Sequence, residues 1–155
     1  MSETHAKPDP KKRGVVTYFV RERRKKTLKD GFSASGLVSA LTVGLPVREL
    51  LDLQASLAVP GEKLAKLLGI SKATMHRQKR AGGRLNPQVS DRVVRLARLL
   101  GLATEVLGDI DDAKQWLNSP QFGLGGAIPL DYAKTEVGAR EVENLLGRIE
   151  YGVYS

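Results

Sequence analysis

The sequence of 155 residues predicts an all-α fold, in which a helix-turn-helix bundle is followed by a small helical C-terminal domain. Apolar residues recur at spacings of three and four along several segments, which is the period of an amphipathic helix. Many of these segments follow a Ser, Thr, Asn or Asp that can cap a helix start, and end at glycine or proline. We divide the chain into an arm over residues 1–30, a helix-turn-helix domain over 31–100 and a second helical domain over 101–155.

The first thirty residues are polar and basic, and we expect them to form a flexible N-terminal arm. Lys11-Lys12-Arg13 and the charged run from Arg21 to Lys26 flank a short apolar patch, Val15 to Val20. Such an arm could neutralise DNA phosphates beside a groove contact, or it could be a solvated tail. The sequence favours neither function.

Two scaffold helices are expected next. Ser33 or Ser35 can open the first, which stops near Gly44, and Pro46 suits the first turn of the second, which ends by Pro60. The broad apolar face of the second helix would consist of Leu50, Leu51, Leu53, Gln54 and Leu57.

The stretch from Gly61 to Arg84 has the pattern of a helix-turn-helix. Its first helix would carry Leu64, Ala65 and Leu68 on one face, Gly69 would turn the chain with a positive φ, and Ser71 would cap the second helix. We expect Met75 to point back toward the first helix. The positions expected to face outward are Lys72, Ala73, His76, Arg77 and Arg80.

DNA binding is the function that this pattern favours, because the stretch carries seven Lys or Arg residues against Glu62 alone. We expect Lys63 and Lys66 to contact phosphates regardless of sequence. The residues expected to meet the groove or its flanking phosphates are Lys72, Thr74, His76, Arg77 and Arg80. A plain helical corner with a solvated basic face is the alternative, and Gln78 occupies a position that is often apolar.

A helix that starts at Asn86-Pro87 and runs to Leu100 would close the bundle. The pattern changes at Gly101, and a separate short helix would run from Leu102 to Leu107 and end at Gly108. Asp109, Asp111 and Asp112 then favour a helix N-terminus.

The glycine-rich stretch 122–129 predicts a tight turn, since no Lys-Ser/Thr pair follows to make a phosphate loop. Thr135 would open the last helix. We expect Val142, Leu145 and Ile149 on its inner side and Glu141, Glu143 and Arg148 on its outer side.

Several functional classes are disfavoured. The chain has no cysteine, and its two histidines, His5 and His76, lie in the arm and on the basic face, so we expect no metal site, no cofactor and no enzymatic activity. No apolar run approaches a membrane span, and a cytoplasmic location is expected. The net charge of +8 comes from the first half, whereas the last third leans acidic, which suggests different partners for the two ends.

Residues 101–155 resemble the C-terminal toxin-binding domain of the Xre/MbcA/ParS antitoxin family. Residues 37–98 resemble that family's Xre-type helix-turn-helix, through Leu64-Ala65, Leu68 to Ser71, Thr74 and Arg77, whereas 1–30 match neither. The matching elements of the last third are Val106 to Asp109, Ala113 with Trp116-Leu117, Pro120, Leu124 to Gly126, Pro129-Leu130, Thr135 with Gly138-Ala139, and Arg148-Ile149 with Tyr151 to Val153.

The resemblance implies an antitoxin that binds a RES-domain toxin, an NAD-consuming or ADP-ribosyltransferase-like enzyme, with its C-terminal region at the mouth of the NAD cleft. It also implies repression of the antitoxin's own operon, and we expect a homodimer within a larger complex, since helix-turn-helix proteins read paired half-sites. The expected toxin-binding residues are Arg148, Glu150, Tyr151, Gly152, Val153, Tyr154 and Ser155.

Two questions stay open at this point. The rings of Tyr151 and Tyr154 and the Ser155 carboxylate could mimic nicotinamide and pyrophosphate in the cleft, or the tyrosines could complete the domain's core. The alternative function is a stand-alone helix-turn-helix repressor whose last third dimerises or senses a ligand.

Overall fold

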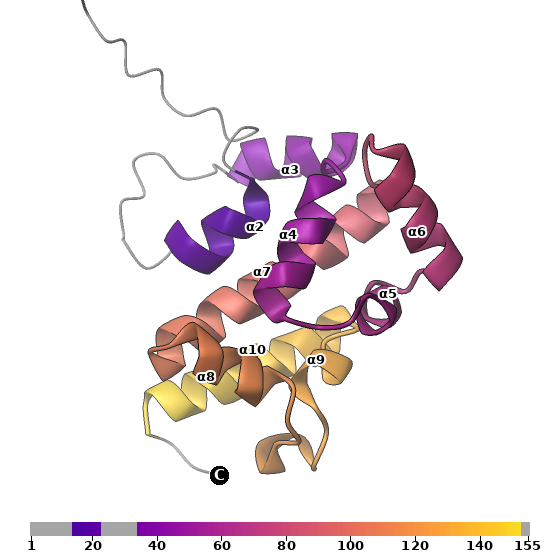
Figure 1. Ribbon diagram of the computed structural model, residues 1–155. Coiled ribbons are helices and arrows are strands. Elements are labelled where there is room, and N and C mark those ends of the chain that lie inside the picture. The colour runs from indigo at the N-terminus through magenta and orange to yellow at the C-terminus, as the bar shows by residue number, and fades with distance from the viewer. Residues whose placement is uncertain (1–13, 23–33, 153–155) are drawn as a thin grey trace, which may run out of the picture.

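The computed structural model describes residues 14–22 and 34–152, and every regular element in these ranges is helical, as predicted (Figure 1). The one isolated extended pairing within these ranges joins Pro46 to Arg84. The elements in chain order are α2 (Val15–Thr17), the π-helical turn η1 (Tyr18–Glu22), α3 (Ala34–Val43), α4 (Arg48–Leu57), α5 (Gly61–Leu68), α6 (Lys72–Ala81), α7 (Pro87–Leu107), α8 (Ile110–Leu117), the 3₁₀ turn η4 (Phe122–Leu124), α9 (Pro129–Tyr132) and α10 (Glu136–Glu150).

The long helix α7 is the axis of the fold, and α2, η1, α4, α8 and α10 pack against it (Figure 1). The Asn86 side chain caps its start by accepting the Val89 amide at 2.8 Å, and Gly108 ends it with a φ of 86°. The break predicted at Gly101 is wrong, because this glycine lies inside the helix. A Cβ at position 101 would lie 2.1 Å from the Phe19 carbonyl oxygen, so the glycine permits η1 to approach closely.

Because α7 runs through residues 100 and 101, the expected domain boundary falls inside a helix. Leu96, Leu99 and Leu100 before it and Ala103 after it belong to one continuous hydrophobic core. The two halves of the chain therefore share their central packing element.

Residues 14–22 do not form part of a flexible arm. Val15, Val16 and Val20 are buried in the core, and the buried Glu49 carboxylate accepts the backbone amides of Val15 and Val16 at 2.9 and 3.0 Å. Residues 1–13 and 23–30 of the expected arm lie outside the described ranges.

The scaffold helices lie close to their expected positions. Helix α3 stops at Gly44 as predicted, but α4 begins at Arg48, two residues after Pro46, because Pro46 lies in the bridge to Arg84. Leu50 and Leu53 are fully buried, whereas Leu51, expected on the same apolar face, is 47% exposed.

The C-terminal helices begin at the capping residues named from the sequence. Asp109 accepts the Asp111 amide at 2.6 Å and opens α8, and Thr135 accepts the Gly138 amide at 3.0 Å and opens α10. The inner face of α10 packs into the core through Val142, Leu145 and Leu146.

Candidate functional site

Helices α5 and α6 form the predicted helix-turn-helix. Gly69 ends α5 with a φ of 67°, and the amide of Ile70 then donates to the Ala65 carbonyl at 3.0 Å. The Ser71 hydroxyl caps α6 by accepting the Thr74 amide at 3.0 Å. From α7, the Arg92 guanidinium donates to the Leu68 carbonyl at 2.7 Å, which fixes the corner against the bundle.

The outer face of α6 is basic and open to solvent. Met75 is buried against the bundle, as predicted from the spacing, and leaves the opposite side of the helix free. Thr74 is half-buried, and its hydroxyl accepts from Ser71 at 2.8 Å and from Arg77 at 3.3 Å. The exposed residues of this face are Lys72, Ala73, His76, Arg77 and Arg80.

Some basic residues of the motif are held by other parts of the chain. Lys63, which we expected to contact phosphates, forms an ion pair with Asp131 of α9 at 3.1 Å. Lys79 donates to the Gln54 side chain at 2.7 Å, and Arg84 donates to the Gly44 carbonyl at 2.9 Å. Lys66 is exposed. The α6 face and Lys66 are therefore the parts of the basic stretch most available to DNA.

At the other end of the molecule, α10 presents the expected toxin-binding residues. Tyr151 is 80% exposed, Glu150 is exposed, and Gly152 adopts a φ of 69° that turns the chain out of the helix. Arg148 is half-buried rather than outward-facing, and its buried Nε has no hydrogen-bond partner among the described residues. Val153, Tyr154 and Ser155 lie outside the described ranges.

A second exposed aromatic side chain, which we did not single out from the sequence, lies in the loop before α9. Phe122 in η4 is 92% exposed, although the loop around it is tightly hydrogen-bonded. The Gln121 amide donates to the Ala127 carbonyl at 3.0 Å, and the Gln121 side chain donates to the Trp116 carbonyl at 2.9 Å. The only sequence signal was an aromatic residue within a Pro- and Gly-rich stretch, which predicts a turn without saying what it displays.

Two family models match the chain on either side of the residue 100 region. The antitoxin Xre-like helix-turn-helix domain matches residues 36–98, and the C-terminal toxin-binding domain of antitoxins Xre, MbcA and ParS matches residues 102–152. An Xre antitoxin of Yersinia enterocolitica is 32% identical over 120 residues, which cover 77% of this chain and 81% of the relative. The chain belongs to the Xre antitoxin family.

Other relatives match this antitoxin over a similar length of chain. The Xre antitoxin of Photorhabdus laumondii is 34% identical over 126 residues, covering 79% of this chain and 85% of the relative. The Prs ADP-ribosylating antitoxin of a Sphingobium species is 28% identical over 127 residues, covering 76% and 80%. This antitoxin therefore combines a helix-turn-helix domain with a toxin-binding domain, which together imply DNA and a toxin as partners.

Ion pairs connect the two domains of this antitoxin besides the shared helix. Arg95 of α7 pairs with Glu136 of α10 at 3.2 Å, and Arg98 pairs with Glu143 at 3.1 Å. Together with the Lys63–Asp131 pair, they tie the helix-turn-helix to the toxin-binding domain.

The buried Glu49 is the other residue whose role we did not infer from the sequence. Burial raises its pKa above the ordinary value, whereas the hydrogen bonds from Val16 and Val15 act in the opposite direction. Within the described ranges, no cluster of His, Asp and Glu is placed to hold a metal, and no helix has the length and apolarity to cross a membrane.

Proposed function

We propose that this antitoxin neutralises a RES-domain, NAD-consuming toxin by lodging its C-terminal segment in the mouth of the NAD cleft. The observation that carries the proposal is the 80% exposure of Tyr151 at the end of α10, inside the matched toxin-binding region. A large aromatic side chain that is left in water by its own fold gains most when a partner covers it.

Arg148 and Phe122 would extend this contact. The buried Arg148 Nε is a donor with no described acceptor, and a turn of this half-buried side chain toward the toxin would let it find one there. Phe122 is displayed on a stiff loop, so burying it against the toxin would require little further ordering of the chain. The remaining proposed contacts are Glu150, Gly152, Val153, Tyr154 and Ser155.

The name of the Sphingobium relative joins an antitoxin to ADP-ribosylation, which supports an NAD-dependent toxin as the partner. The inhibition would be steric and would need no chemistry from the antitoxin itself. The chain would do its work in the cytoplasm, where the toxin finds NAD.

The second half of the proposal is repression of the antitoxin's own operon. Two copies of the chain would place α6 in successive major grooves, with Lys72, Thr74, His76, Arg77 and Arg80 at the bases and flanking phosphates. The exposure of the α6 basic face supports this role, as does the burial of Met75 on the opposite side.

The test is to express the neighbouring toxin gene alone, with the full antitoxin and with an antitoxin lacking residues 151–155, and to measure growth and NAD level. We expect rescue by the full chain and its loss with the shortened one. Operator binding by the shortened chain serves as the control, because the deletion leaves α6 untouched. Undiminished rescue by the shortened chain would refute the blocking mechanism, and NAD turnover unaffected by the full chain would refute the choice of toxin.

A further inference from the structure

The last helix, α10, carries a glycine that the fold of this chain does not need. Of its glycines Gly138 and Gly147, the first is required, because a Cβ at position 138 would collide with the Tyr132 carbonyl oxygen. A Cβ at Gly147 would meet no described atom within 4 Å, and the backbone at this position is ordinary α-helix. Since glycine destabilises a helix interior relative to alanine, Gly147 weakens α10 without relieving a clash inside the described part of the chain.

Gly147 lies in the middle of an exposed ridge on α10. The ridge consists of Arg140, Asn144, Gly147 and Tyr151, whose spacings of four, three and four place them on one side of the helix. The Tyr151 amide donates to the Gly147 carbonyl at 3.1 Å, so the ridge continues to the end of the helix. A solvent-facing helix side usually carries several charges, whereas this ridge carries one, on Arg140. Its composition is therefore that of a contact surface.

We propose that an α-helix of the toxin crosses α10 at Gly147, with Asn144 and Tyr151 on either side of the crossing point. Packed helices have axes about 8–10 Å apart, depending on the side chains at the contact, and a glycine there permits the shortest separation. The proposal rests on the proposed function only in taking the toxin as the partner.

The geometry of the ridge favours a helix over an extended segment of the toxin. A helix satisfies its own backbone hydrogen bonds, so it can press against Gly147 without losing any of them. A strand or loop would bring N–H and C=O groups to a helix side, where the backbone groups of α10 already bond to one another.

The position of the ridge favours the toxin over the other partners. Gly147 lies within residues 102–152, which match the toxin-binding domain, and it is one helical turn before the exposed Tyr151. DNA would require more basic groups than the one on Arg140. A second copy paired through Gly147 would cover Tyr151 in both chains and leave neither of them open to the toxin.

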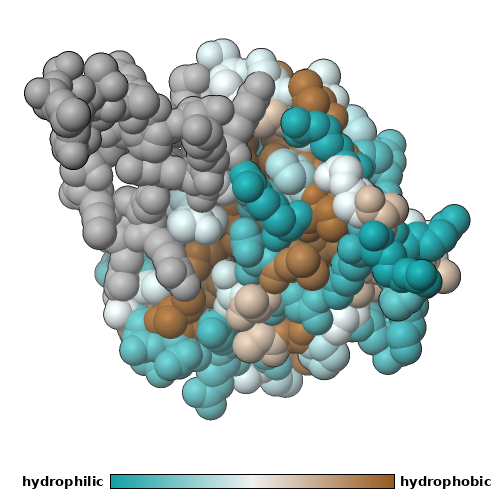
Figure 2. All heavy atoms as spheres, turned by 45° about the horizontal axis from the view of Figure 1, so that its top comes forward, coloured by the Kyte–Doolittle hydropathy of each residue, from teal (hydrophilic) through white to brown (hydrophobic). Residues whose placement is uncertain are grey.

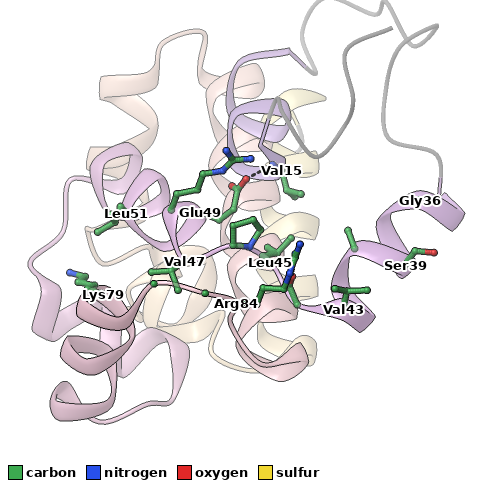
Figure 3. A pocket seen from close by; sticks show the side chains of 16 residues that line it. Val15, Gly36, Ser39, Val43, Leu45, Val47, Glu49, Leu51, Lys79 and Arg84 are labelled. Carbon is green, nitrogen blue, oxygen red and sulfur yellow. Dashed lines mark hydrogen bonds between the residues drawn. The ribbon is translucent and has the colours of Figure 1, made fainter. Parts of the chain in front are cut away.

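Another apolar surface of the molecule lies around α3, where Val38 and Val43 are each 63% exposed (Figure 2). A hollow of about 700 Å³ lies beside this helix, with Val43 on one side and Leu51 and Lys79 on the other (Figure 3). All the residues that line the hollow precede residue 85 and lie outside the matched toxin-binding region. The α3 face therefore supplies a control surface for experiments on the ridge.

The first test compares stability with toxin affinity in Gly147→Ala and Gly147→Leu. We expect Gly147→Ala to raise the melting temperature of the antitoxin alone by about 1–4 °C, because the added methyl group meets no clash in the free chain. The dissociation constant for the purified toxin, measured by calorimetry, should rise about 10-fold with alanine and about 100-fold with leucine, since a larger side chain forces the two helices apart. A Gly147→Leu variant that binds the toxin like the native chain would overturn the proposal.

Two control variants locate the contact. Val137 is 75% exposed on the same helix, but it lies about 15 Å from Gly147 along the axis, where two crossing helices have diverged. We expect native toxin affinity from Val137→Leu and from Val43→Glu on the α3 face. An equal loss of affinity in Val137→Leu and Gly147→Leu would overturn a crossing centred on Gly147. A loss found only in Val43→Glu would place the toxin on the α3 face and would also overturn the proposal.

The antitoxin lacking residues 151–155 separates this inference from the proposed function. If Gly147→Leu bound the toxin normally while the shortened chain failed to rescue growth, the helix contact would be wrong and the blocking mechanism would stand. If Gly147→Leu lost the toxin while the shortened chain still rescued growth, the blocking mechanism would be wrong and the helix contact would stand. A Gly147→Leu antitoxin whose mass alone, by light scattering, differed from that of the native chain would make a second copy the occupant and overturn the proposal.

Thiol labelling gives an independent readout, because the chain has no native cysteine. Asn144 is exposed beside Gly147, so Asn144→Cys in the free antitoxin should react readily with a maleimide, and bound toxin should slow this reaction strongly. Val137→Cys should react at the same rate with and without toxin. A rate at Asn144→Cys that bound toxin leaves unchanged would overturn the proposal.

Discussion

The carboxylate of Glu49 lies against the backbone of Val15, with Oε1 accepting the Val15 amide at 2.9 Å across 34 residues of chain. The second oxygen accepts the Val16 amide at 3.0 Å. The start of α2 is thus capped by a side chain from α4, because Gly14 has no side chain that could cap it. Glu49 and the buried side chains of Val15, Val16 and Val20 together hold the first described segment in the core.

Replacing Glu49 by alanine should detach that segment. Two backbone amides would lose their acceptors, and we expect the free energy of unfolding to fall by about 2–4 kcal/mol. Urea denaturation measures the loss, and hydrogen exchange at Val15 and Val16 should accelerate. Glu62→Ala, at an exposed site in α5, should change stability by less than about 0.5 kcal/mol. Unchanged exchange at Val15 in Glu49→Ala would show that the cap does not hold α2.

The same carboxyl should make stability depend on pH. Burial raises the pKa of Glu49 above its ordinary 4.5, so the folded protein binds this proton more tightly than the unfolded chain does. The resulting contribution to the free energy of unfolding is full below pH 4.5 and is lost as pH rises through the folded-state pKa.

Glu49→Gln removes this titration. We expect the stability of the native chain relative to Glu49→Gln to fall as pH rises above 4.5, as measured by urea denaturation at several pH values. A difference that stays flat, or that grows with pH, would contradict the raised pKa.

Replacing two helical glycines by alanine should change the free energy of unfolding in opposite directions. At Gly101 a Cβ would lie 2.1 Å from the Phe19 carbonyl oxygen, so Gly101→Ala should push η1 away and cost about 1–3 kcal/mol. At Gly147 in α10 a Cβ meets nothing within 4 Å, so Gly147→Ala should stabilise the protein by about 0.5–1 kcal/mol. Thermal and urea unfolding of the pair provide the measurement, and a Gly101→Ala variant that is as stable as the native protein would mean that η1 does not rest on α7.

Binding experiments should distinguish residues that contact bases from residues that contact only phosphates. If Arg77 touches a base, Arg77→Ala should weaken the specific operator by about 1–3 kcal/mol and leave random DNA less affected. Lys66→Ala should weaken every sequence alike and reduce the salt slope by about 1. Lys114→Ala, in α8, should change neither. Operator binding left intact by Arg77→Ala would mean that α6 does not enter the groove as proposed.

Replacing Phe122 should weaken toxin binding without changing the stability of the fold. Because the side chain is 92% exposed, Phe122→Ala should change the free energy of unfolding by less than about 0.5 kcal/mol. It should weaken toxin binding by about 2 kcal/mol, measured by calorimetry with the purified toxin. Val137→Ala is the control for an exposed apolar residue elsewhere, and equal toxin affinity of both variants would remove Phe122 from the interface.

Local signals in the sequence were sufficient for much of this fold. The caps at Ser71, Asn86 and Thr135 act within three residues of themselves, so each could be recognised without knowing the rest of the structure. The turn at Gly69 and the burial of Met75 followed from the same short-range pattern.

The errors arose where a distant partner decides the local structure. Val15 and Val16 looked like part of an arm because their capping carboxylate lies in α4. Gly101 looked like a break because the backbone that it accommodates, at Phe19, is far away in sequence. The ion pair of Lys63 with Asp131 could not be foreseen for the same reason, and the expected phosphate contact of Lys63 stays a prediction.

Helix α7 has a consequence for engineering new specificities. A chimera that joins the front half of this chain to the rear half of a relative must be spliced within an unbroken helix. One residue too many at the junction would rotate one half by about 100° against the other. It would also bring Arg95 and Arg98 out of line with Glu136 and Glu143. A chimera that is meant to bind a new toxin must therefore keep the helical register of α7 across the junction, in addition to having compatible surfaces.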